Sequence, residues 1–139
     1  MRKYLIFAGS VFLTVACLRL ASAADTPDFA GEYADKKFLS GQAVFQMSID
    51  QHGNTASIWF SAGYNDGHGS APEAEGKGNV TGKGALEFTF KDGDGNSGSG
   101  TITRSGADVT VSIKPTHVAD PRCLIFYRQN IHLKRVSKK

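Results

Sequence analysis

Cysteine is nearly absent from this sequence of 139 residues, which contains only Cys17 and Cys123. If an N-terminal segment that includes Cys17 is removed, Cys123 remains alone and no intramolecular disulfide can form. The fold must then be stabilised by a hydrophobic core rather than by covalent cross-links. Cys123 itself lies in the apolar run 123–127, where a buried and unreactive thiol is expected.

Helical periodicity is also missing. After residue 23, no long stretch places apolar residues at the spacing of an amphipathic helix. In the whole chain, glycine (16) is far more frequent than proline (4). Apolar and polar residues alternate instead, which is the pattern of half-buried strands. This alternation predicts strands at residues 43–50, 55–62, 86–91, 101–103 and 109–113, with further short strands at 29–33, 78–81, 123–128 and 131–135.

Local turns connect most of these predicted strands. The fold class is therefore all-β: an antiparallel meander of about 7–9 short strands that forms a small barrel or a two-sheet sandwich. Two longer connections interrupt the meander, at residues 64–76 and 114–122. Long loops on a small rigid scaffold often carry function, so they are the first places to look for a site.

The only long hydrophobic run lies at the N-terminus. Arg2 and Lys3 precede the uncharged segment 4–18, which is shorter than the about 20 residues that span a membrane. The small residues at 21–23 resemble a signal-peptidase site. The sequence predicts a signal peptide over residues 1–23, a single β-barrel-like domain over 24–139, and export to the periplasm or the medium, with no transmembrane span in the mature chain.

A second interpretation of the N-terminus stays open. Residues 13–17 loosely resemble a bacterial lipobox, in which Cys17 is lipidated and becomes the first residue. The mature protein would then be a lipoprotein anchored through Cys17.

Net charge gives no support to nucleic-acid binding. The whole chain carries +3, but loss of Arg2, Lys3 and Arg19 leaves 13 basic residues against the 13 acidic ones. A formally neutral chain lacks the excess of positive charge that phosphate backbones attract. The composition therefore predicts no nucleic-acid partner.

Residues 64–76 form the most function-like segment of the sequence. This loop combines an aromatic side chain, carboxylates, a histidine and a hydroxyl, and its candidate partner-binding residues are Tyr64, Asp66, His68 and Ser70. Asp66 could orient His68, and His68 could act on Ser70 as a base. However, the segment has no nucleophile elbow and no obvious oxyanion hole. We therefore predict a non-enzymatic binding loop, with no catalytic residue.

Metal and cofactor sites are not predicted. One histidine with flexible carboxylates falls short of the clustered ligands of a zinc site. Asp92, Asp94 and Asn96 occupy the first, third and fifth places of a calcium loop, but Ser97 and Thr103 stand where that loop needs glycine and glutamate. A hairpin turn is the preferred interpretation of residues 92–96.

Both ends of the predicted domain resemble known barrels. Residues 29–33 (Phe-Ala-Gly-Glu-Tyr) resemble the Gly-x-aromatic opening of lipocalin-like and avidin-like, calycin-type barrels, and residues 131–135 are similar to their last strand. The resemblance implies that Arg135 closes over Tyr33 as a structural cation–π pair. Tyr33 replaces the more usual tryptophan, and the match implies nothing about a ligand.

Three functions remain as hypotheses. Small exported barrels of this size resemble periplasmic inhibitors of lysozyme-type hydrolases, which insert a protruding polar loop into an enzyme's cleft. The favoured hypothesis is therefore an exported, non-enzymatic binding protein that inhibits a secreted or cell-wall hydrolase. The alternatives are a carrier of a small apolar ligand, which bulky inward residues disfavour, and an uncharacterised hydrolase that uses the 64–76 loop.

Overall fold

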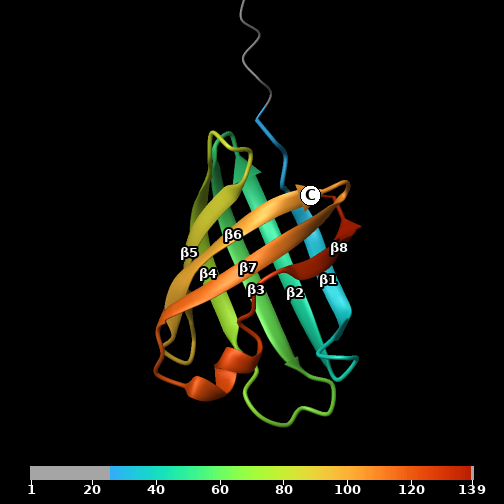
Figure 1. Ribbon diagram of the computed structural model, residues 1–139, viewed down its shortest axis with the longest axis vertical. Helices are drawn as coiled ribbons and strands as arrows, with labels where there is room; N and C mark the ends of the chain where they lie inside the picture. The colour runs from blue at the N-terminus through green and yellow to red at the C-terminus, as the bar shows by residue number, and fades with distance from the viewer. Residues whose placement is uncertain (1–25, 139) are drawn as a thin grey trace, which may run out of the picture.

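The structure is a computed structural model that describes residues 26–138, so the predicted signal peptide and Cys17 lie outside the described residues. Eight strands and one short 3-10 helix follow one another along the chain (Figure 1). The elements are β1 (Gly31–Phe38), β2 (Ala43–His52), β3 (Thr55–Tyr64), β4 (Glu73–Val80), β5 (Leu86–Asp92), β6 (Ser97–Ser105), β7 (Asp108–His117), η1 (Pro121–Ile125) and β8 (Ile131–Ser137).

The strands form a closed antiparallel barrel in simple meander order, because β1 pairs with both β2 and β8. The all-β meander prediction is confirmed, and of its two forms the barrel is the one adopted. Connections alternate between the two ends of the barrel. We call the end that carries residues 39–42, 65–72, 93–96 and 118–130 the loop end, and the end that carries the tight turns at 53–54 and 106–107 the hairpin end.

Aromatic rings fill the barrel interior. Phe60 lies 5.7 Å from Phe45 and 5.2 Å from Phe90 between ring centroids, and Tyr127 lies 5.3 Å from Phe90. All four side chains are at most 7% exposed. The bulky positions predicted to face inward do so, and the interior at this level is occupied by side chains at packing distances typical of a core.

Glycines make room for two of these rings. Both phenylalanines of β5 lie directly between two glycines of the neighbouring strands: Phe90 lies between Gly76 and Gly98, and Phe88 between Gly78 and Gly100. A Cβ added at Gly100 would lie 2.3 Å from Phe88 Cζ. The glycine-rich strands β4 and β6 are therefore the complement of the aromatic strand between them.

The segment after η1 completes the barrel wall where β8 does not reach. β8 pairs with β7 only at Val109–Val111, so the loop-end half of β7 has no strand partner on that side. The segment after η1 covers this gap: Ile113 N donates to Arg128 O at 2.9 Å, and the fully buried ring of Phe126 packs against Phe38 at 6.5 Å.

Several element boundaries differ from the sequence prediction, and three of the differences lie at the loop end. Residues 123–128 were expected to form a strand and instead contain the end of η1, because Pro121 begins the helix and Asp120 caps it by accepting from Arg122 N. The loop predicted over 64–76 is shorter, since β4 begins at Glu73, and β7 extends through Pro115 to His117.

At the hairpin end, Arg135 contacts Tyr33 as expected. The guanidinium carbon lies 5.3 Å from the centre of the Tyr33 ring, and Arg135 Nη2 donates to the Tyr33 hydroxyl at 3.0 Å. Burial raises the pKa of Tyr33 above its ordinary value, although Arg135 opposes the shift. The pair links β1 to β8 where the barrel closes.

Candidate functional site

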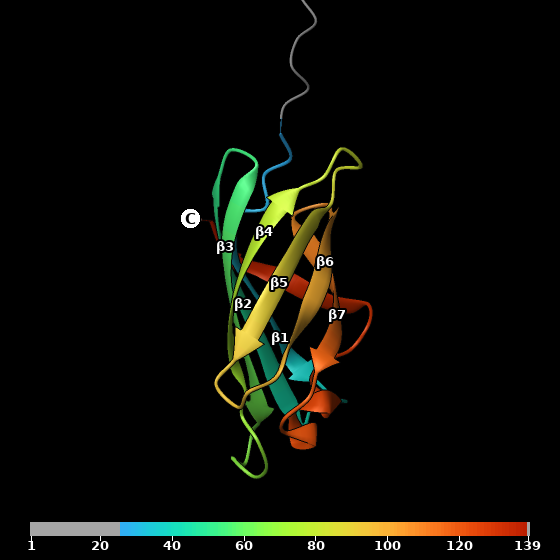
Figure 2. The same ribbon diagram turned by 90° about the vertical axis from the view of Figure 1, so that its left-hand side faces the viewer.

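The predicted binding loop lies at the loop end of the barrel, next to η1 (Figures 1 and 2). Tyr64 ends β3, and its ring stacks on His68 with centroids 4.0 Å apart. Asp66 accepts hydrogen bonds from the backbone N–H of His68 and pairs with the imidazole Nδ1. Three of the four predicted residues are therefore brought together in one ordered turn.

The hydrogen bonds within this turn affect its charge. The backbone N–H and then the imidazole of His68 stabilise the ionised carboxylate, which holds the pKa of Asp66 below its ordinary value. The side chains of Asp66 and His68 are 70% and 60% exposed. The turn thus presents an ionised carboxylate and an imidazole to solvent on a fixed backbone.

Ser70 has a different role from its three neighbours. Its side chain is buried, and its hydroxyl donates to Asp120 Oδ2 at 3.3 Å. Asp120 also accepts two hydrogen bonds from the Arg122 guanidinium, which together with the Arg122 N–H lower the pKa of Asp120 to about 2. Ser70 therefore fastens the loop to the segment before η1, while His68 pairs with Asp66.

Exposed apolar side chains lie beside the loop on η1. Leu124 and Ile125 are 39% and 37% exposed, and Phe126 directly after them contacts the Tyr64 ring at 5.4 Å. Sequence reasoning missed these residues because the apolar run 123–127 was assigned to a strand. The signal that could have found them is Asp120-Pro121, a helix start that precedes the run.

A network of hydrogen-bonded polar side chains connects the segments at this end of the barrel. Asp92 accepts from the Tyr127 hydroxyl at 2.5 Å and from the Asn96 side chain at 2.8 Å. Asn96 Oδ1 in turn accepts from the N–H groups of Ala119 and Asp120. The turn 92–96 is thus a hairpin that ties β5 and β6 to the 118–130 segment.

The same network contains the one group of possible metal ligands among the described residues: Asp92, Asp94 and Cys123. Burial, with Asp94 nearby, raises the pKa of the Cys123 thiol to about 11, so the thiol is protonated at neutral pH. Burial also raises the pKa of Asp92, but the hydrogen bonds from Tyr127 and Asn96 outweigh it and the net shift is downward. The two carboxylates accept hydrogen bonds: Asp92 from Tyr127 and Asn96, and Asp94 from the Cys123 thiol.

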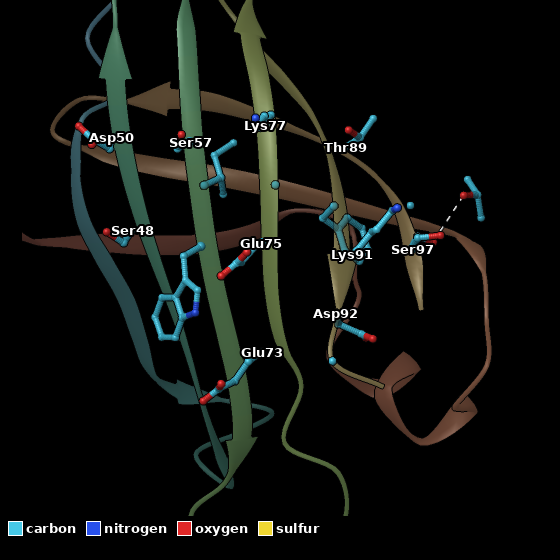
Figure 3. Close-up of a pocket in the computed structure, with 17 residues that line it drawn as sticks. Ser48, Asp50, Ser57, Glu73, Glu75, Lys77, Thr89, Lys91, Asp92 and Ser97 are labelled. Atoms are coloured by element: carbon cyan, nitrogen blue, oxygen red, sulfur yellow. Dashed lines mark hydrogen bonds between the residues drawn. The ribbon is translucent and has the colours of Figure 1, made fainter. Parts of the chain in front are cut away.

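A second surface feature is a broad groove of about 1170 Å³ on the outer face of β2 to β6 (Figure 3). Its most unusual member is Trp59, the single tryptophan of the chain, which is 36% exposed. Trp59 stands between the buried residues Ile58 and Phe60 of β3, so its ring faces outward. The polar residues that surround the ring on neighbouring strands became evident only from the strand register.

No protein-family model, no curated protein and no solved structure matches this chain. Among residues 26–138, no helix has the length and apolar character needed to cross a membrane. The function must therefore be inferred from the chemistry of the loop end and of the groove.

Proposed function

We propose that this protein is a non-enzymatic binding protein that captures a protein partner through its loop end, with a secreted or cell-wall hydrolase as the first candidate. The observation that carries the proposal is the preformed turn in which Tyr64, Asp66 and His68 hold one another. A loop that is ordered before binding loses less conformational entropy when it docks.

The neighbouring surface has the composition of a protein interface. Tyr64 supplies an aromatic group, and Leu124 and Ile125 place apolar area beside it. The polar pair of Asp66 and His68 lies at the exposed rim. An apolar centre with an aromatic anchor and a polar rim is typical of protein–protein contacts.

The two alternatives draw less support. A carrier of a small apolar ligand needs an interior cavity, whereas Phe45, Phe60 and Phe90 pack at ring distances of 5.2–5.7 Å. A hydrolase that uses this loop needs a nucleophile activated by His68, but the Ser70 hydroxyl donates to Asp120 instead. Both observations favour recognition by the outer surface.

Export and family relationship belong to the same proposal. The charged start and the uncharged segment 4–18 support export as a free periplasmic or secreted protein, with anchoring through Cys17 as the alternative. The closed meander barrel and the contact of Arg135 with Tyr33 support a relationship to calycin-type barrels. A role as a hydrolase inhibitor rests on analogy with small barrels of that kind.

The proposal is tested by replacing the polar pair. The Asp66→Ala/His68→Ala variant should lose inhibition of, and co-purification with, a lysozyme-type hydrolase from a panel of such enzymes, while its thermal stability stays nearly unchanged because both side chains are exposed. Inhibition is measured as the rate of cell-wall lysis at increasing concentrations of the barrel.

The chain offers a matched control at the opposite end. Asp50 and His52 form a second exposed Asp–His pair near the hairpin end, with 3.6 Å between His52 Nε2 and Asp50 Oδ1. The Asp50→Ala/His52→Ala variant should inhibit like the unaltered protein. Equal inhibition by both double variants would reject the loop as the contact surface, and no inhibition of any hydrolase by the unaltered protein would reject this class of partner.

A further inference from the structure

The outer groove is independent of the loop end and has an ordered chemistry of its own. Strand register places five outward side chains in one continuous row across the sheet, each directly opposite the next: Ser48, Trp59, Glu75, Lys91 and Ser97. Strands lie about 4.8 Å apart, so the row is about 19 Å long. A single exposed indole therefore lies within an extended band of hydrogen-bonding groups.

A second row lies beside the first. It contains Asp50, Ser57, Lys77 and Thr89, again directly opposite one another, and Figure 3 shows Ser57 on β3 next to Glu75 and Lys77 on β4. Glu73 precedes Glu75 on the same face of β4. Hydroxyls, carboxylates and an ammonium group thus lie on the strands around the ring.

In the described part of the chain, four charged side chains in this groove, Glu73, Glu75, Lys77 and Lys91, form no ion pairs with one another. Glu75 is paired in register with Lys91, yet within residues 26–138 neither makes an ion pair within 4.0 Å, and neither do Glu73 and Lys77. Their carboxylate oxygens and ammonium groups remain free to bond a ligand. Opposite charges that face each other without pairing leave both donor and acceptor capacity at the surface.

We infer that this groove binds an oligosaccharide, with the Trp59 indole stacked on the apolar face of a sugar ring. Sugar hydroxyls would donate to Glu75 and Glu73 and accept from Lys77 and Lys91. Stacking of an aromatic ring on C–H groups, combined with side chains that both donate and accept hydrogen bonds, suits a polyhydroxylated ring. The length of the row accommodates a short chain of such rings.

Charge and topology argue against the other macromolecular ligands. The groove is lined by four acidic residues and two lysines, which disfavours a polyanion such as a nucleic acid. Each strand from β2 to β6 is paired on both sides, so a peptide cannot add to a free sheet edge here. A sugar chain needs only the side chains of the face, and these are present.

The single tryptophan makes the test direct, because all tryptophan fluorescence reports on this groove. The protein is titrated with three probes: cellohexaose, chitohexaose and fully deacetylated chitosan hexamer. We expect a saturable change in fluorescence with at least one of them at a concentration of about 1 mM or below. Isothermal calorimetry with the Trp59→Ala variant should then show no heat of binding.

Matched variants distinguish the groove from general surface binding. Glu75→Gln should weaken binding about tenfold by removing a charged acceptor. The control is Glu87→Gln. Glu87 lies on β5, opposite Asn79 and outside the groove, so this variant should bind the saccharide like the unaltered protein. The Asp66→Ala/His68→Ala variant should also bind normally, which separates this inference from the proposed function.

Three results would overturn the inference. These are the absence of a fluorescence response to every saccharide, equal affinities of the Glu75→Gln and Glu87→Gln variants, and a saturable response to a mixed Lys/Glu hexapeptide that exceeds the response to every saccharide. The last result would assign the groove to peptides instead.

Discussion

Single side chains hold the loop end together, and Tyr127 is central among them. Its ring packs against Phe60 and Phe90 in the core, while its hydroxyl donates to Asp92 at 2.5 Å. Among the described residues, no buried side-chain nitrogen or oxygen lacks a hydrogen-bond partner. A buried polar network of this kind is costly to interrupt, because the remaining partner stays desolvated.

Removal of the Tyr127 hydroxyl should therefore lower stability with little loss of packing. We expect Tyr127→Phe to reduce the free energy of unfolding by about 1.5–3 kcal/mol, the value of a hydrogen bond to a charged group. Urea unfolding followed by circular dichroism measures the change. Tyr64→Phe is the control, since the Tyr64 hydroxyl makes no hydrogen bond within residues 26–138, and its effect should stay within about 0.5 kcal/mol. Equal losses in both variants would contradict the role given to the network.

At the scale of strands, β5 depends on the glycines beside it. A Cβ at position 100 would lie 2.3 Å from Phe88 Cζ and 2.8 Å from the carbonyl oxygen of Ser112. The carbonyl belongs to the backbone and the ring is buried, so neither can move freely. The packing of β4, β5 and β6 is therefore specified by the absence of side chains as much as by their presence.

Gly100→Ala should consequently destabilise the barrel by about 1–3 kcal/mol through overpacking. Gly82→Ala is a suitable comparison, because nothing lies within 4 Å of a Cβ built there, and its effect should be neutral or slightly stabilising. Shortening the ring in the Gly100→Ala/Phe88→Leu double variant should cost less than the sum of the single changes, as a double-mutant cycle would show. Additive losses would mean that the two positions do not collide.

The same glycines explain why some strands could be predicted from the sequence and why most of β4 could not. Alternation revealed β2, β3 and β5 because their inward positions are large and apolar. It revealed only the end of β4, since the inward positions 74, 76 and 78 are alanine and glycine. These small residues form a buried face only when Phe88 and Phe90 of the next strand cover them, and that pairing is not visible in a local pattern.

The candidate site shows the same limit. Tyr64, Asp66 and His68 are close in sequence, so their association could be predicted from the composition of one loop. The bond from Ser70 to Asp120 joins residues separated by 50 positions, and η1 begins at a cap and a proline that the apolar run after it obscured. Local chemistry was predictable, whereas contacts between connections at the loop end depend on closure of the barrel.

For the whole molecule, closure joins two ends with different chemistry. The hairpin end is fastened by Arg135 and Tyr33, and the loop end by Asp92, Asn96 and Asp120. The Tyr127 phenol and the Cys123 thiol are buried weak acids at the loop end, and burial raises the pKa of both. Because the described residues contain no disulfide, these interactions and the aromatic core maintain the barrel, and the ionisation of the loop end should affect its global stability.

Stability should be greatest between about pH 4 and pH 9. The pKa values of Asp92 and Asp120 are lowered from 3.8, to about 2 for Asp120, so their contribution is present above 3.8 and is lost as the pH falls through the lowered values. The pKa of Cys123 is raised from 9.0 to about 11, so its contribution is present below 9.0 and is lost as the pH rises toward 11.

The loss of stability at alkaline pH gives the sharper measurement, because the contribution of Cys123 can be removed by substitution. Urea unfolding followed by Trp59 fluorescence should show the free energy of unfolding falling between pH 9 and pH 10 by up to about 1.4 kcal/mol per pH unit, the value for one proton. Cys123→Ala should be less stable at pH 7 because it leaves a cavity, and its stability should fall less steeply over that interval, because only Tyr33 and Tyr127, whose pKa values are also raised, still contribute to the slope. An unchanged alkaline slope in Cys123→Ala would show that the buried thiol is not the titrating group.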